Sequence, residues 1–368
     1  MRASSRGARL AAVLTASALA FAGCGAEEET ASQGGGSGGG EAAPSAEATE
    51  AAQQKVQEQL GGTCTLEQYG GEAAEMANAT VGFSQSEKEA NPFRIAETQS
   101  IRDQAKKAGV KRLIVTNANS QLNKQISDVQ DLVARGVDAL IIAPLNSEGL
   151  EPALAAAREK DIPVITVDRK LTGPEHCKDY LTFIGSDFVE QGRRAADALI
   201  KATGGKAKAA ILLGSSGNNV TEDRNKGFLD TIKEKAPGIE VVAQQTGEFQ
   251  REKGQSVTEQ LIQANPEIDA VYAHNDEMAL GALVALRTAG KQPGQDVKVV
   301  SVDGTRNAVQ AITKGQVNAV IESNPRFGPL AFQTLEQFWA GDEIRENTII
   351  SDRAYDETNA EQSLDSAY

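Results

Sequence analysis

The sequence predicts an α/β fold of two doubly wound lobes, each built around a parallel β-sheet. From residue 80 onward, short apolar runs rich in β-branched residues alternate with longer helical patterns. This alternation is typical of parallel sheets that carry helices on both faces. The chain has 368 residues, more than one ordinary domain needs. Because the units form two successive series, we expect two lobes.

The first series predicts strands at 80–83, 111–116, 138–143 and 163–167, and helices at 94–108, 122–135 and 147–160. The predicted helix at 122–135 places Ile126, Val129, Leu132 and Val133 on one face and stops at Gly136. Apolar residues at this spacing form the buried stripe of an amphipathic helix, and a glycine is a common helix terminator.

The second series predicts strands at 181–184, 209–213, 240–243, 270–273, 297–302 and 319–321. Helices are expected at 188–203, 220–235, 252–264, 277–289, 307–313 and 328–339. Three of these helices are followed by glycine or by proline and glycine, at 204–205, 237–238 and 290. These residues end helices, so they support the boundaries.

The N-terminus has the pattern of an export signal. Arg2, Arg6 and Arg9 precede the apolar run 10–22, which is too short to span a membrane in the ordinary way. Residues 1–23 therefore read as a lipoprotein signal peptide, with Cys24 as the lipid-bearing residue. The alternative is a plain secretory signal followed by an incidental cysteine.

The stretch 24–78 is expected to be a lipid-anchored, disordered tether. It contains three consecutive glutamates at 27–29 and a run of glycine broken by one serine at 34–40. Such a composition buries too little apolar surface to fold. We expect an extracytoplasmic protein, on the cell surface or in a periplasm, that contacts the membrane only through the lipid.

Two further cysteines, Cys64 and Cys177, remain in the exported part of the chain. Disulfides persist outside the cytoplasm. The two thiols either form a bridge, which would attach the segment before the first strand to a loop of the first lobe, or stay free.

Charge and motifs exclude several functions. The net charge of −14 opposes nucleic-acid binding, which needs a basic face. The sequence has no nucleophile elbow, zinc-protease motif, phosphate-binding loop or EF-hand loop. We therefore expect no catalytic residues, no metal and no cofactor.

Polar residues gather where predicted strands end. Asp168 and Arg169 follow the strand at 163–167, Asn275 follows that at 270–273, and Asp303 follows that at 297–302. Ligands of doubly wound sheets bind outside the carboxyl ends of the strands. Facing lobes would place these groups in one cleft.

These residue types suit a sugar. A carboxylate beside a guanidinium offers acceptors and a fixed fork of donors for vicinal hydroxyls. Phe93 and Phe249 offer faces for the C–H side of the ring. Each residue also has an ordinary structural explanation: a helix cap for Asp276, a turn for Asp303, a surface ion pair for Asp168 and Arg169, or core packing for Phe249.

From about residue 80 to the end, the chain resembles the periplasmic sugar-binding proteins of the ribose/galactose type, with the type I fold, and most of all their galactofuranose-binding branch. The motifs that carry this likeness are Val-Gly-Phe-Ser-Gln at 81–85, Ala-Glu-Thr at 96–98, Ile-Ala-Pro at 142–144, Asp-Arg at 168–169, Lys-Gly-Phe at 226–228, Val-Tyr-Ala-His-Asn-Asp at 271–276 and Val-Asp-Gly at 302–304. The order of the series makes it specific.

The resemblance implies positions for ligand contacts. On the first lobe these are Asn91, Phe93, Arg94, Asp168 and Arg169, and on the second lobe Arg224, Phe249, Asn275 and Asp303. Arg94 stands where ribose binders carry an aromatic residue and the galactofuranose type carries arginine. Glu222 replaces a ligand-contacting arginine of ribose binders. Ser323 falls where many members have a glutamine at a hinge.

The resemblance also implies three crossings between the lobes, near Ser186, Ser323 and residue 349. The N-terminal lobe would then comprise 79–186 with 324–349, and the C-terminal lobe 187–323 with 350–368.

The function that this implies is that of a monomeric binding protein, which captures a monosaccharide for an ABC permease. The monosaccharide would be a pentose or a hexose, in furanose or pyranose form. The alternatives are a sensor that presents the sugar to a membrane receptor, a sugar-processing enzyme that uses carboxylates such as Asp168, and a sugar-responsive repressor. The signal segment and the missing DNA-binding headpiece argue against the repressor, and the arginines beside the carboxylates argue against the enzyme.

Overall fold

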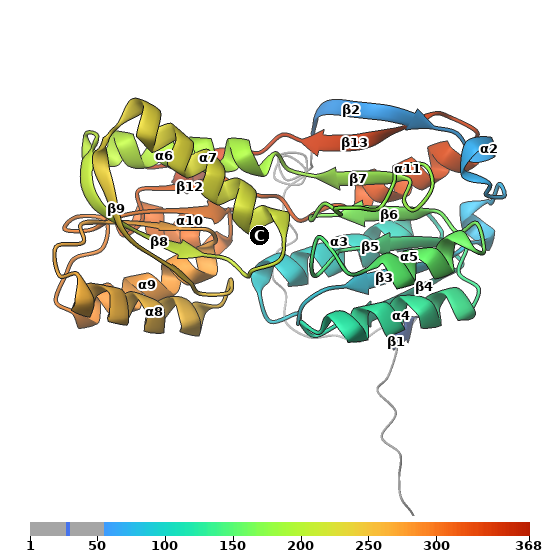
Figure 1. The fold of residues 1–368 in the computed structure, drawn as a ribbon, viewed down its shortest axis with the longest axis horizontal. Coiled ribbons are helices and arrows are strands. Elements are labelled where there is room, and N and C mark those ends of the chain that lie inside the picture. Colours follow the sequence, from blue (N-terminus) through green and yellow to red (C-terminus); the bar gives the residue numbers. More distant parts are fainter. Residues whose placement is uncertain (1–26, 30–54) are drawn as a thin grey trace, which may run out of the picture.

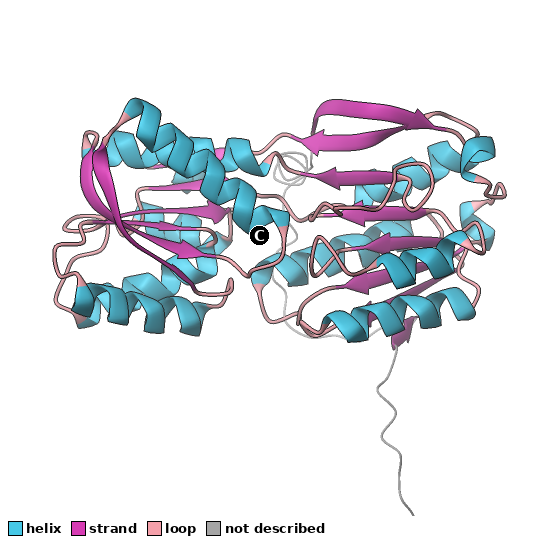
Figure 2. Cartoon of the chain, viewed as in Figure 1, coloured by secondary structure: helices cyan, strands magenta, loops and turns pink. Residues whose placement is uncertain are grey.

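The structure, a computed structural model, describes residues 27–29 and 55–368. Two α/β lobes lie side by side, and helices cover both faces of each sheet (Figures 1 and 2). This confirms the predicted fold class. The signal segment and Cys24 lie outside the described residues. Among those residues, no helix has the length and apolar character needed to cross a membrane.

The N-terminal lobe contains the strands β1 (Glu27–Glu29), β2 (Val56–Cys64), β3 (Thr80–Gln85), β4 (Arg112–Asn117), β5 (Ala139–Ile142), β6 (Val164–Val167), β7 (Thr182–Gly185) and β13 (Ile344–Ile350). Its helices are α2 (Leu66–Tyr69), η1 (Met76–Asn78), α3 (Pro92–Lys107), α4 (Leu122–Ala134), α5 (Glu151–Arg158) and α11 (Gly328–Trp339). The strand order is β1-β4-β3-β5-β6-β7-β13-β2. Only the edge strands β1 and β2 pair antiparallel. The order reverses beside β3, so the carboxyl ends of β3 and β5 border a crevice.

The C-terminal lobe contains β8 (Lys206–Leu213), β9 (Gly238–Thr246), β10 (Ala270–Ala273), β11 (Lys298–Asp303), β12 (Ala319–Glu322) and β14 (Ala354–Asp356). Its helices are α6 (Phe188–Thr203), α7 (Asn219–Lys235), α8 (Arg251–Ala264), α9 (Asp276–Thr288), α10 (Arg306–Thr313) and α12 (Ala360–Ser363). The order β14-β12-β11-β10-β8-β9 repeats the winding of the first lobe. The carboxyl ends of both sheets therefore face the interlobe gap (Figure 1).

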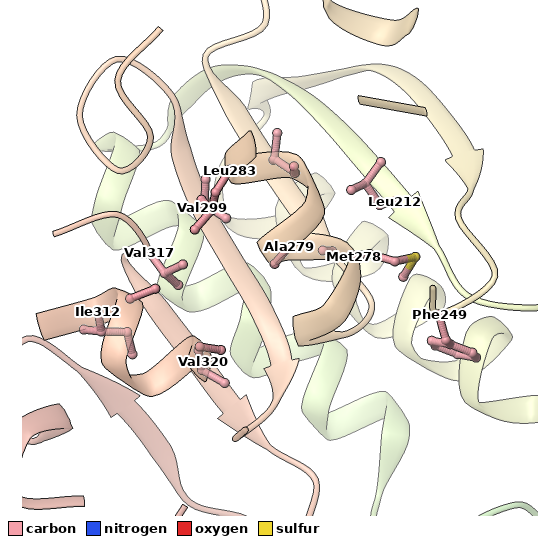
Figure 3. Packing of buried hydrophobic residues seen from close by; sticks show 14 of the residues in the cluster. Leu212, Phe249, Met278, Ala279, Leu283, Val299, Ile312, Val317 and Val320 are labelled. Carbon is pink, nitrogen blue, oxygen red and sulfur yellow. The ribbon is translucent and has the colours of Figure 1, made fainter. Parts of the chain in front are cut away.

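The central strands of each sheet are buried on both faces, as their apolar sequences predict. In β10, Val271 and Ala273 join one hydrophobic cluster, whereas Ala270 and Tyr272 join another on the opposite face. This split follows from the two-residue repeat of a strand. Figure 3 shows the first cluster, in which α9 packs over the sheet and Met278 lies beside Phe249.

The helix expected at 147–160 is shorter in the structure, where α5 begins at Glu151. The residues before it stay in a loop because their backbone groups bond elsewhere. The backbone N–H of Ser147 donates to the Gly217 carbonyl on the other lobe at 2.9 Å, and its carbonyl accepts from the N–H of Thr172.

The expected tether at 24–78 is wrong in part, because much of this segment is ordered onto the N-terminal lobe. β1 pairs with β4, and β2 pairs with β13 along most of its length. The ring of Tyr69 is buried with its centroid 5.8 Å from that of Phe338. Most of β2 is exposed, so it gave no apolar pattern in the sequence. Backbone pairing, rather than burial, holds this strand in place.

A disulfide joins Cys64 at the end of β2 to Cys177 in the loop before β7, with Cα atoms 5.3 Å apart. It attaches the segment before β3 to the first lobe, which is the bridged alternative of the sequence analysis. Cys64 is fully buried. The bond closes a loop across a separation of 113 residues.

Three segments connect the lobes: 186–187 between β7 and α6, 323–327 between β12 and α11, and 351–353 between β13 and β14. Asp352 links two of them. Its carboxylate accepts from the Ser186 hydroxyl at 3.1 Å and from the Gln191 amide at 2.7 Å. The same amide donates to the Glu322 carbonyl at 3.3 Å, next to the remaining connection. The crossings therefore form one hydrogen-bonded unit.

We expect the double variant Cys64→Ala/Cys177→Ala to lose about 2–5 kcal/mol of stability, because the unfolded chain regains the freedom of a long loop. Urea unfolding followed by circular dichroism measures this loss. Reductant should lower the midpoint of the wild-type protein and leave that of the variant unchanged. Equal midpoints for the oxidised wild type and the variant would contradict the expectation.

Burial raises the pKa of Asp352 from 3.8 to about 7. Because the folded pKa exceeds the unfolded one, this group stabilises the fold below about pH 4, and its contribution is lost as the pH rises to about 7. Asp352→Asn keeps an acceptor for Gln191. We expect it to reduce the fall in stability between these pH values by about 1 kcal/mol or more.

Urea midpoints measured across this pH range test the effect. Asp365→Asn, at a carboxylate that is 79% exposed, is the control and should keep the wild-type slope. An unchanged slope in Asp352→Asn would show that this carboxyl is not the titrating group.

Candidate functional site

A cavity lies between the lobes at the carboxyl ends of the strands. Its walls come from both sides of the gap: Glu87, Asn91, Phe93, Arg94, Asp168 and Arg169 from the N-terminal lobe, and Val220, Arg224, Phe249, Asn275 and Asp303 from the C-terminal lobe. All the residues that the sequence analysis selected for ligand contact, apart from Glu222 and Ser323, are among them.

Arg94 is held by three carboxylates. Its Nε lies 3.0 Å from Glu87 Oε2, and its Nη1 lies 2.8 Å from both Glu97 Oε2 and Asp168 Oδ2. The guanidinium is almost completely buried. Glu97 lies behind it with no access to solvent, and burial raises the pKa of Glu97 to about 7 despite the nearby guanidinium.

Arg169 lies on the same wall, and two of its three guanidinium nitrogens bond to groups of the protein. Nη1 donates to the carbonyls of Pro144 and Leu145 at 3.3 and 2.8 Å, and Nη2 donates to Glu87 Oε1 at 2.8 Å. Its buried Nε makes no hydrogen bond within the part of the chain that the structure describes. Asp168 Oδ2 lies 3.7 Å from this donor, too far for a hydrogen bond. A buried donor without a partner is costly, so Nε is suited to a ligand oxygen.

The opposite wall pairs Arg224 with Asp303. Arg224 donates from Nε to Gln191 Oε1 at 2.8 Å and from Nη1 to the His274 carbonyl at 2.6 Å. Its Nη2 lies 3.8 Å from Asp303 Oδ1. Burial raises the pKa of Asp303 well above its usual value, although Arg224 opposes the shift.

Both acidic residues at the strand ends adopt unusual backbone angles. Asp168 has φ of 66° and Asp303 has φ of 139°. Residues other than glycine avoid positive φ, and exceptions gather at functional sites where the surroundings enforce them. Asp276 supports the backbone conformation at Asp303. Its Oδ2 accepts hydrogen bonds from the N–H groups of Gly304 and Thr305, the next two residues, at 2.9 and 2.7 Å. Asp276 is thus the support of this turn and not a helix cap, and it has no place in the cavity wall.

The cap of α9 is Asn275 instead. Its Oδ1 accepts from the N–H of Met278 at 3.0 Å, and its Nδ2 donates to the Phe249 carbonyl at 3.2 Å. Asn91 likewise caps α3, accepting from Phe93 N–H at 2.9 Å, and reaches the same Phe249 carbonyl at 3.5 Å. Each amide retains one N–H and further acceptor capacity for a ligand.

Phe249 is both a wall of the cavity and part of the hydrophobic core. Its φ is 59°, and its ring packs against the end of β8. A Cβ at Gly214 would lie 2.0 Å from Cζ of this ring, so only glycine fits there. Arg169 Cζ lies 5.9 Å from the ring centroid across the gap.

Two selected residues do not reach the cavity. Glu222 is exposed on α7, two positions before the buried Arg224. Two residues correspond to a rotation of about 200° around a helix, so these side chains occupy opposite faces. Ser323 is buried in the second crossing, where its N–H donates to the Asp303 carbonyl at 2.8 Å. It lies near the site without lining it.

The sequence analysis missed Glu87. This residue follows β3 in a loop, and its carboxylate contacts both Arg94 and Arg169. A glutamate in a polar loop gives no periodic signal. Only its position after a strand end, the rule that selected Asp168, pointed to it.

The rim of the cleft is joined by hydrogen bonds between the lobes. Asn219 N–H donates to the Ser147 hydroxyl at 2.9 Å, and Asn219 Oδ1 accepts from the backbone N–H of Lys170 at 3.0 Å. Together with the bond from Ser147 to Gly217, these contacts join the two lobes directly.

This arrangement can bind polar groups but offers little reactive chemistry. The walls combine fixed donors, carboxylate acceptors and two aromatic rings. Within the described residues, no group of three or more His, Cys, Asp or Glu side chains is placed to hold a metal ion.

Comparison with known proteins identifies the family. Residues 81–343 match the profile of the periplasmic binding protein domain. The chain belongs to this family. It is 38% identical over 266 residues to the galactofuranose-binding protein YtfQ of Escherichia coli, covering 71% of this chain and 82% of that protein. It is 37% identical over 267 residues to the ribose import binding protein RbsB of Bacillus subtilis, covering 72% and 83%.

A solved structure shows the same architecture. The binding protein of the arabinose ABC transporter of Shewanella sp. ANA-3, bound to α- and β-L-arabinofuranose, superposes with a TM-score of 0.74 at 36% identity, covering 77% of this chain and 94% of that one. The family is one of extracytoplasmic binding proteins. The relatives named here are binding proteins and not enzymes, which confirms the expectation of a binding protein.

Proposed function

We propose that this protein captures a monosaccharide between its lobes and delivers it to an ABC sugar importer. The observation that carries the proposal is the cavity in which guanidinium, carboxylate and amide groups of both lobes surround one space beside two phenylalanine rings. Similarity to binding proteins named for galactofuranose and ribose supports it. The proposed ligand is a pentose or a hexose, in furanose or pyranose form.

Each cavity residue would contact a different part of the sugar. Arg169 Nε donates to a ring hydroxyl, Asp168 and Asp303 accept from hydroxyls, and the remaining amide N–H groups of Asn91 and Asn275 complete the polar contacts. Phe93 and Phe249 cover the C–H faces of the ring. A ligand without hydroxyls would leave these buried groups unpaired, so the site penalises it.

Capture follows from the two-lobe construction. A ligand held by both walls stabilises the closed arrangement by its differential affinity for it. The rim contacts of Ser147 and Asn219 form only when the lobes are together, and the three crossings allow them to separate as rigid bodies. The closed form is then the species that a permease recognises.

Anchoring completes the proposal. Lipidation of Cys24 would hold a monomeric protein at the outer face of the membrane, on the cell surface or in a periplasm. This arrangement keeps the captured sugar close to its importer.

A screen of pentoses and hexoses by thermal unfolding, followed by calorimetry on the hits, tests the sugar-binding function. At a ligand concentration 100-fold above its Kd, binding to the folded state adds about 2.7 kcal/mol of stability. Stabilisation by no sugar in the panel would refute the function. Conversion of a bound sugar into product would instead indicate an enzyme.

Arg169→Ala and Asp303→Ala should each weaken binding of the sugar found in the screen by at least about tenfold, because each leaves polar groups unpaired in the closed cleft. Glu222→Ala is the matched control: it removes a charge from α7 on the exposed face, and its affinity should equal that of the wild type. Calorimetry measures all three. Unchanged affinity in both cavity variants would place the sugar elsewhere.

A further inference from the structure

The cavity brings together three cationic and three acidic side chains. Arg94, Arg169 and Arg224 face Glu87, Asp168 and Asp303. The formal charges of these six side chains therefore balance. A carboxylate that neutralises the arginines therefore decides whether the pocket attracts an anion.

Glu87 is the counter-ion of two of the three arginines. Its Oε2 lies 3.0 Å from Arg94 Nε, and its Oε1 lies 2.8 Å from Arg169 Nη2. The two guanidinium side chains are only 4% and 2% exposed, whereas that of Glu87 is 16% exposed. Burial favours protonation of Glu87, but the two arginines outweigh it and lower its pKa to about 2. The carboxylate thus stays charged at every physiological pH.

The two arginines depend on Glu87 to different extents. Arg94 keeps two other carboxylates, Glu97 and Asp168, each at 2.8 Å. Arg169 has a single close one, since Asp168 lies 3.7 Å from its Nε. Glu87 therefore occupies the position at Arg169 Nη2 that the carboxylate of an acidic ligand would take.

The loop that carries Glu87 is held in place. The Glu87 carbonyl accepts from Asn117 Nδ2 at 2.8 Å, at the end of β4. The next acidic residue in the loop, Glu89, is exposed. The carboxylate of Glu87 is thus positioned by the fold and is not a chance contact of a free loop.

We propose that Glu87 sets the charge specificity of the cleft: as the counter-ion that Arg94 and Arg169 share, it makes the site accept neutral sugars and reject sugar acids. This inference rests on the proposed sugar-binding function. A uronic acid in the cleft would bring a further carboxylate close to Glu87, Asp168 and Asp303, and Arg169 would already be paired with Glu87. Repulsion between like charges in a desolvated site is a strong means of exclusion.

The experiment compares L-arabinose, D-galactose and D-galacturonate, whose pyranose rings carry the same hydroxyl configuration and differ at one substituent, by calorimetry on the wild type, Glu87→Gln, Glu87→Asp and Glu89→Gln. In the wild type, galacturonate should bind at least about tenfold more weakly than the better neutral sugar. In Glu87→Gln this ratio should fall at least about tenfold, because one negative charge is gone and Arg169 is free to pair.

The other variants are controls. Glu87→Asp keeps the charge and should keep the discrimination, and Glu89→Gln removes a charge from the same loop outside the cavity and should match the wild type. Circular dichroism verifies folding, and the wild-type comparison is decisive even if Glu87→Gln does not fold: equal or tighter binding of galacturonate overturns the inference.

Two failures are distinguishable. If the wild type binds a neutral sugar and Glu87→Gln retains the wild-type ratio, the charge specificity is refuted while the sugar-binding function stands. If the wild type binds neither of the two neutral sugars nor any other sugar of the wider screen, the function itself fails, and this inference fails with it.

Discussion

Three guanidinium groups buried between two lobes impose the constraint on which the rest of the structure depends. A buried charge is tolerated only where opposite charges and hydrogen bonds replace the lost water. Each cavity arginine is accordingly surrounded: Arg94 by three carboxylates, Arg169 by Glu87 and two carbonyls, and Arg224 by Gln191 and a carbonyl. The partners come from several strand ends and loops, so these ion pairs and hydrogen bonds fix the positions of those segments relative to one another.

The same constraint connects the cavity to the crossings between the lobes. Gln191 accepts from Arg224 and donates to Asp352 and to the Glu322 carbonyl. A side chain on α6 thus joins a cavity arginine to one connecting segment, at Asp352, and to the end of β12, next to another. In the proposed function, a sugar that engages Arg224 acts on the part of the molecule about which the lobes would move.

Much of the fold and most of the candidate site could be predicted from the sequence. Alternating strand and helix patterns gave two series of units, and one topological rule, that ligands lie at the carboxyl ends of parallel strands, selected Asp168, Arg169, Asn275 and Asp303. The rule has limits. Glu222 was selected by the resemblance to ribose-binding proteins, but the rotation of α7 places it on the exposed face. Glu87 was missed because its importance lies in contacts with Arg94 and Arg169, on α3 and after β6.

By itself, the sequence determined which segments between residues 80 and 339 are strands and which are helices, because the spacing of apolar residues is a local property of the chain. It also determined which polar residue types stand at the strand ends. Only the tertiary structure decided which charges pair, that Cys64 meets Cys177, and that the polar segment at 56–64 becomes an edge strand. Those outcomes depend on contacts between residues far apart in the chain, and no local pattern encodes such distances.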